Sequence, residues 1–83
     1  MNYRYAAVKM EYPSKNNDGL EPFDWTKTRW TLDGTSDTIP DDTRPLEGLN
    51  ILGGLGWRLH SSHNLYYGNV VRGVSHTLIQ EYE

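Results

Sequence analysis

Hydrophobic residues recur at helical spacing just past the middle of the chain. The leucines of this stretch fall every third residue, at Leu46, Leu49, Leu52 and Leu55. Ile51 lies four residues before Leu55, so the spacing is that of an amphipathic helix. Pro45 is tolerated in a first helical turn, and Gly56 suits a helix that ends in a left-handed residue. The pattern predicts a helix that begins near Pro45 and ends at Gly56.

The glycines of this stretch make the predicted helix depend on packing. Gly48, Gly53 and Gly54 each cost about 1 kcal/mol relative to alanine inside a helix. Glycine also lets two backbones come close, so Gly53 is the expected point of contact between helix and sheet. Thr43 is the expected N-cap, because its hydroxyl can accept a hydrogen bond from the first turn.

Alternation of apolar and polar residues predicts strands at residues 3–12, 27–32, 56–62 and 70–83. Trp57 and Leu59 are expected to face the helix, with Gly73 at a bulge in the last strand. Residues 14–19 read as a turn, and residues 35–44 and 63–69 as loops. We therefore predict a single small α+β domain over residues 1–83. It has an antiparallel sheet of three to four strands, one helix packed on one face, and an irregular insertion at about 13–44.

The residues at 49–59 resemble those of a known family. Leu49, Asn50, Leu52, Gly53, Gly56, Trp57 and Leu59 follow the pattern Leu-Asn-x-Leu-Gly-x-x-Gly-Trp-x-Leu. This pattern, with Tyr3 and Tyr5 near the start of the chain, is similar to that of the DUF4177-like small bacterial and phage domains of unknown function. The resemblance covers the first strand and roughly the last forty residues. It implies a small α+β fold and no particular activity.

Two positions depart from the family pattern. Ile51 and Leu55 stand where family members usually carry charged residues. They widen the apolar arc of the helix beyond what one sheet face normally covers. Either the insertion at 13–44 covers these side chains, or a second chain does.

Composition narrows the classes of function. The chain is acidic, with a net charge of -3, which makes nucleic acid an unlikely partner. It contains no cysteine and no apolar run of the roughly 20 residues that a membrane helix needs, so we expect a cytoplasmic protein. Six tyrosines and three tryptophans stand beside an apolar fraction of only 36%. Surplus aromatics with a small core favour an oligomer or a binding protein over an enzyme.

No catalytic or metal-binding motif is recognisable. His60 and His63 would point to opposite faces of a strand, so no metal site is predicted. The acidic residues between 33 and 42 lack the alternation of a calcium loop. Ser61 and Ser62 lie beside His63, but a nucleophile and its base must meet through the fold with an orienting carboxylate. We expect neither an enzyme nor a cofactor.

The sequence favours a non-enzymatic protein-interaction module, in character like phage-encoded accessory or inhibitor proteins that block a host protein. Its expected partners are a second copy of itself and an unidentified protein. The predicted contact residues are Ile51, Leu55, Tyr66, Tyr67, Asp37, Asp41 and Asp42. The alternative is a protein that binds a nucleotide-like ligand at a subunit interface through Arg29, Trp30, Arg72 and Trp25.

Overall fold

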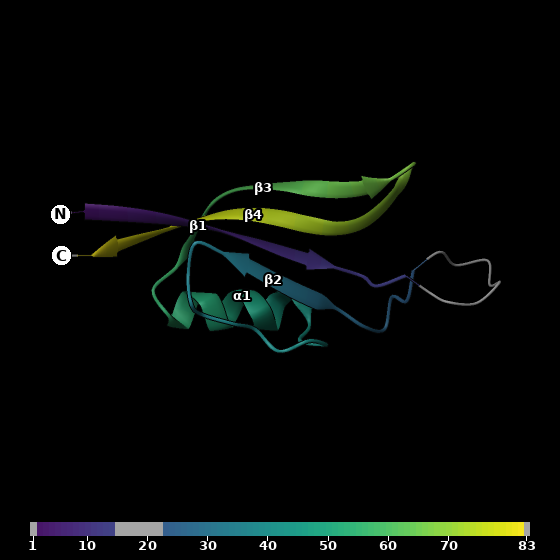
Figure 1. The fold of residues 1–83 in the computed structure, drawn as a ribbon, viewed down its shortest axis with the longest axis horizontal. Coiled ribbons are helices and arrows are strands. Elements are labelled where there is room, and N and C mark those ends of the chain that lie inside the picture. The colour runs from purple at the N-terminus through teal and green to yellow at the C-terminus, as the bar shows by residue number, and fades with distance from the viewer. Residues whose placement is uncertain (1, 15–22, 83) are drawn as a thin grey trace.

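The computed structural model describes residues 2–14 and 23–82. Within these residues the chain forms β1 (Asn2–Glu11), β2 (Arg29–Asp33), α1 (Pro45–Gly54), β3 (Arg58–Tyr67) and β4 (Val70–Tyr82). The strands make one sheet in the order β2-β1-β4-β3, and every neighbouring pair is antiparallel (Figure 1). This confirms the predicted α+β fold. Of the turn predicted at 14–19, residues 15–19 lie outside the described part of the chain.

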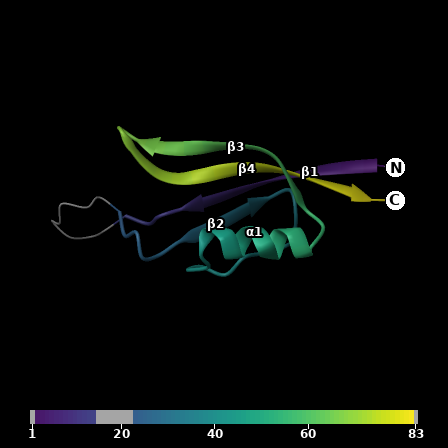
Figure 2. The same ribbon diagram turned by 180° about the vertical axis from the view of Figure 1, so that it is seen from behind.

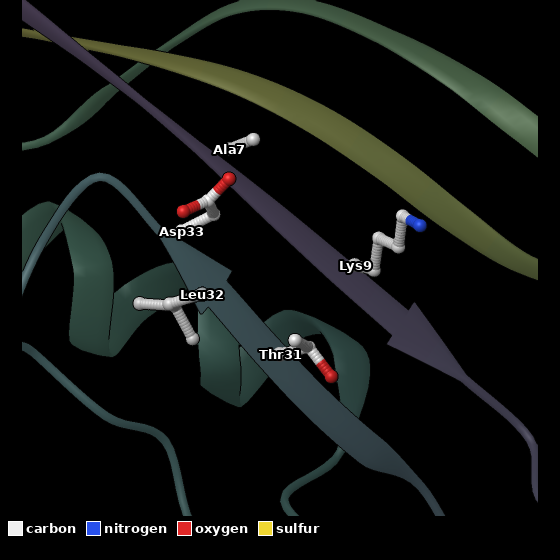
Figure 3. A pocket seen from close by; sticks show the side chains of 5 residues that line it. All are labelled: Ala7, Lys9, Thr31, Leu32 and Asp33. Atoms are coloured by element: carbon white, nitrogen blue, oxygen red, sulfur yellow. The ribbon is translucent and has the colours of Figure 1, made fainter.

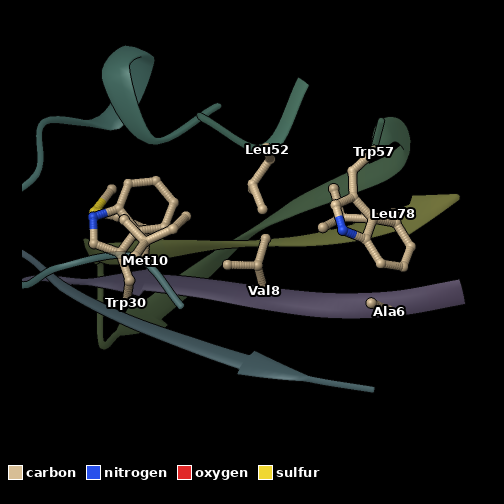
Figure 4. Packing of buried hydrophobic residues seen from close by; sticks show 8 residues of the cluster. Ala6, Val8, Met10, Trp30, Leu52, Trp57 and Leu78 are labelled. Carbon is tan, nitrogen blue, oxygen red and sulfur yellow. The ribbon is translucent and has the colours of Figure 1, made fainter. Parts of the chain in front are cut away.

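The core lies between α1 and one face of the sheet. Side chains alternate across a strand, so the even-numbered residues of β1 face the helix and its odd-numbered residues face away. The buried cluster comprises Ala6, Val8, Met10, Trp30, Ile39, Leu52, Trp57 and Leu78 (Figure 4). Trp30 and Ile39 come from the predicted irregular insertion, within which β2 is a regular edge strand.

The helix is rotated relative to the prediction. Leu46 is 70% exposed, whereas Ile51 packs against the core. Gly48, and not Gly53, marks the close approach. A Cβ on Gly48 would lie 2.3 Å from the Trp30 ring, and one on Gly53 would meet nothing within 4 Å. The large indole of Trp30 sets the rotation, because only a glycine leaves room for it.

The start of the helix is held by hydrogen bonds from two side chains to the main-chain carbonyl of Thr43, and not by the predicted cap. Arg44 occupies the N-cap position, and no side chain caps the first turn. The buried Thr43 acts through its carbonyl, which accepts hydrogen bonds from Thr28 Oγ1 at 2.6 Å and from Trp30 Nε1 at 2.9 Å. Thr43 therefore ties the entry of α1 to β2.

The end of the helix is fastened to β4. Gly56 has φ 92°, as predicted for a left-handed helix end. The Leu55 carbonyl accepts a hydrogen bond from Gln80 Nε2 at 2.6 Å, and Gln80 Oε1 accepts one from Arg4 Nε at 2.5 Å. The Arg4 guanidinium also lies 5.2 Å from the centre of the Tyr82 ring. These contacts join β1, β4 and α1 at one end of the sheet.

The predicted loop at 63–69 is largely wrong, because β3 continues to Tyr67. The turn to β4 is only two residues long, with Gly68 at φ 61°. Glycine at the first position of a two-residue loop is a hairpin signal.

The register with β4 skips His60 and Arg72, so each of these is the extra residue of a bulge. The bulge expected at Gly73 therefore falls on its neighbour. Glycine is needed at 73 because a Cβ there would lie 2.3 Å from the Met10 carbonyl oxygen.

None of the helices in the described residues is both long enough and apolar enough to cross a membrane.

Candidate interaction site

The outer edge of β3 is unpaired in the described residues. The sheet ends at β3, which pairs with β4 on one side only. The strand is ten residues long, and nine of its residues are exposed. The other edge strand, β2, has only five residues. Edge strands present a row of N–H and C=O groups that can pair with another strand.

The β3 edge carries few of the features that discourage such pairing. Natural edge strands are commonly short, or interrupted by proline, or lined with charged side chains. Between Ser61 and Tyr67 the sequence contains no Lys, Arg, Asp, Glu, Pro or Gly. The bulge at His60 is the one irregularity in its pairing to β4 before Leu65. The register shift after Leu65 places its extra residue, Arg72, on β4, so β3 itself has no bulge between residues 61 and 67, and a second strand can extend the sheet there.

Two predicted contact residues lie at the tip of the β3–β4 hairpin. Tyr66 is 59% exposed, and its hydroxyl accepts a hydrogen bond from Asn64 Nδ2 at 3.4 Å. Tyr67 is 64% exposed, and its ring meets that of Phe23 edge-on, with the centroids 5.6 Å apart. Both rings offer apolar surface beside the edge.

The other predicted contact residues lie elsewhere. Leu55 is 44% exposed at the end of α1, which Figures 1 and 2 show at the opposite end of the sheet from the hairpin tip. Ile51 is half-buried against the core. The Asp37 carboxylate accepts a hydrogen bond from Trp57 Nε1 at 3.1 Å, which anchors the 35–44 loop to the core. The predicted contact residues therefore do not form one patch.

The two remaining aspartates of the loop differ in their contacts. Asp42 has φ 69° and exchanges hydrogen bonds with Thr28: its N–H donates to the Thr28 carbonyl, and its carboxylate accepts from the Thr28 N–H. It holds the loop against the start of β2. Asp41 is exposed.

The four residues of the alternative ligand site do not all lie together: Arg29 and Arg72 both lie beside Glu11, whereas Trp30 faces the helix. Trp30 is buried under Gly48, whereas its neighbour Arg29 points to the opposite face of the sheet. Arg72 forms an ion pair with Glu11, with Nη1 and Oε2 3.4 Å apart. Trp25 packs edge-on against Tyr12, with ring centroids 5.0 Å apart.

A serine and a histidine meet across β3 and β4. Ser62 Oγ lies 2.7 Å from His76 Nδ1. Burial, and secondarily the nearby His63, lowers the pKa of His76 below its ordinary value of 6.5, so the imidazole is neutral at neutral pH. In the described residues no carboxylate hydrogen-bonds His76, so the orienting member of a catalytic triad is not in place. The pair acts as a cross-strand contact. His63 is the histidine next to the two serines in the sequence, but the pairing of β3 with β4 places His76 beside Ser62.

The sheet face away from the helix carries a shallow hollow of about 330 Å³. It is lined by Ala7, Lys9, Thr31, Leu32 and Asp33, at the pairing of β1 with β2 (Figure 3). Its charged groups, Lys9 and Asp33, are exposed side chains of opposite sign. In the described residues there is no group of three or more metal-ligating side chains, here or elsewhere.

Comparison of the chain with family models, curated proteins and solved structures finds no match.

Proposed function

We propose that this chain is a non-enzymatic protein-interaction module that binds an extended polypeptide segment along the edge of β3. The observation that carries the proposal is the length and exposure of this edge: ten residues, paired on one side only. In strand addition, main-chain hydrogen bonds supply affinity, and alternate side chains supply specificity.

The side chains of β3 set what the partner segment must contain. Leu59, Ser62, Asn64 and Tyr66 lie on the helix side, as their pairing with Leu78, His76, Val74 and Val71 indicates. Leu59 is 51% exposed and Tyr66 is more so, and small polar residues stand between them. A partner that places apolar residues near Leu59 and Tyr66, with small polar residues in the middle, would bury both anchors.

The small-ligand alternative has less support. Stacking on Trp30 would require the indole to leave its place under Gly48 and break its hydrogen bond to the Thr43 carbonyl. The exposed edge needs no such rearrangement to accept a strand.

A random-peptide display library selected against the purified protein tests the proposal. We expect it to yield peptides of extended character whose binding protects alternate β3 amides from hydrogen exchange, since alternate residues of an edge strand point their N–H groups outward. Selected peptides that protect no β3 amide would contradict strand addition, as would a selection that yields no binder for a protein that is also monomeric.

Adjacent proline variants provide the matched control. His63 and Asn64 lie in the regular part of the ladder, so one of them donates its N–H to β4 and the other points it outward. The outward proline should abolish peptide binding with little change in melting temperature, and the inward one should lower the melting temperature. If both variants unfold, the exchange measurement on the unmodified protein decides.

A further inference from the structure

We infer that the segment seated on β3 is β3 of a second copy of this chain, paired antiparallel about a twofold axis through His63. This inference rests on the proposed function and names the partner of the same edge. The resulting dimer would have one continuous sheet, with β3 and its copy at the centre.

The bulge at His60 determines where the axis falls. With that residue skipped, as it is in the pairing with β4, nine residues of β3 remain, and His63 is the middle one. An axis through His63 therefore pairs the strand along its whole length. An axis through Ser62 leaves Tyr66 and Tyr67 unpaired, and an axis through Asn64 leaves Leu59 and Arg58 unpaired.

The register through His63 also matches side chains on each face. In an antiparallel pair, directly opposite residues share a face. Ser62 comes opposite Asn64 of the second copy, and both lie on the helix side. Ser61 comes opposite Leu65 of the second copy on the other face, with His63 meeting its own copy on the axis.

The two ends of the strand supply the apolar and charged contacts. Leu59 comes opposite Tyr66 of the second copy, which places the two largest exposed side chains on the helix side of β3 in contact, twice per dimer. Arg58, the one formally charged residue of the strand, comes opposite Tyr67 of the second copy. An arginine beside a tyrosine ring is a favourable pair, and no like charges meet.

A residue on a twofold axis meets its own copy, and this gives a direct test. The His63→Asp and His63→Lys variants each place two like charges opposite one another, so each alone should raise the dissociation constant by up to about fivefold relative to the unmodified protein. An equimolar mixture should recover the original dissociation constant or a lower one. The measurement is sedimentation equilibrium over a dilution series, with the two variants carrying different mass labels so that mixed dimers are counted.

The same swap at Asn64 is the matched control. Asn64 meets Ser62 of the second copy and not itself, so Asn64→Asp and Asn64→Lys should weaken the dimer less and gain less on mixing. A larger rescue at 64 than at 63 would overturn the register.

Failure of this inference can be told apart from failure of the proposed function. An unmodified protein that stays monomeric up to millimolar concentration overturns self-pairing. A dimer whose dissociation constant is changed neither by the charge substitutions at His63 nor by those at Asn64 overturns it as well. Peptides from the display library that protect β3 in a monomeric protein would leave strand addition standing with a different partner. Absence of both dimer and peptide binding would overturn the two together.

Discussion

β1 and β3 are equal in length, and both pair with β4, yet they differ in almost every other respect. Three residues of β1 are buried and alternate with exposed ones, whereas no residue of β3 is buried. β1 pairs with β4 along its whole length and with β2 over residues 7–11, and the helix covers one of its faces, whereas in the described residues β3 pairs with β4 alone. Where β1 presents Ala6, Val8 and Met10 to the core, β3 presents Ser62 and Asn64 on the same side of the sheet. The fold is stabilised around β1, and β3 is left available for pairing.

The same truncation made in the core and in β3 should give the largest difference between the two regions. Leu52→Ala removes a fully buried side chain at the centre of the core and should cost about 2–5 kcal/mol of unfolding free energy. Leu59→Ala removes a half-exposed one from β3 and should change the unfolding free energy of the monomer by less than about 0.5 kcal/mol. Urea unfolding of dilute protein measures both. Equal losses would mean that the hairpin belongs to the core.

Two glycines of the helix extend the contrast between buried and open positions on a smaller scale. Gly48→Ala forces a methyl group into the Trp30 ring and should cost about 1–3 kcal/mol. Gly53→Ala meets open space and should gain up to about 1 kcal/mol through helix propensity alone. Thermal unfolding should therefore move in opposite directions for the two variants. A Gly48→Ala protein as stable as the original would show that α1 does not rest on Trp30 as described.

The hydrogen bond between Trp57 and Asp37 predicts a smaller effect. Trp57→Phe keeps most of the buried ring but removes the Nε1 donor, and should cost about 0.5–1.5 kcal/mol for the lost hydrogen bond. Asp37→Ala should cost a similar amount, and the double variant should cost less than the sum of the two. Strict additivity in this double-mutant cycle, followed by urea unfolding, would show that the two side chains do not interact.

The smallest expected effect is the pH dependence that arises from His76. Its pKa is lowered in the folded chain, so the unfolded chain binds more protons once the pH falls below the ordinary value of 6.5. The contribution of His76 to stability is therefore present above that pH and is lost as the pH falls through the folded pKa. His76→Gln should show a smaller fall in melting temperature between about pH 7.5 and pH 5.5 than the unmodified protein. An identical fall would assign the dependence to other groups.

Much of the fold could be predicted because its determinants are local in sequence. The leucine spacing, Pro45 and Gly56 indicate the helix, and alternation in β1 and β4 indicates the strands. The rotation of the helix could not be predicted, because it depends on which glycine receives the ring of Trp30, a residue far from the helix in the chain.

The candidate site was predictable only in part. Tyr66 and Tyr67 do lie beside the exposed edge, but the sequence predicts a strand end at Ser62 and a loop at His63 and Asn64, which the structure places within β3. Polar composition favours a loop, and the strand forms because β4 pairs with these residues through a tight hairpin. The Gly68-Asn69 pair was the local signal for that hairpin. That β3 is an edge follows from the order of the strands, which alternation within one strand does not specify.

Amide hydrogen exchange of β3 and β1, measured at two protein concentrations, is the decisive test of β3 as a binding surface. We predict that at low concentration the amides of β1 residues 7–11, which have a strand on each side, exchange slowly, while the β3 amides alternate between slow and fast, because every second N–H of β3 points away from β4. At high concentration the fast β3 amides should become slow as the second copy pairs with them, and β1 should not change. Fast β3 amides that remain fast at every concentration, and in the presence of the selected peptides, would show that this edge binds neither a second copy nor a peptide.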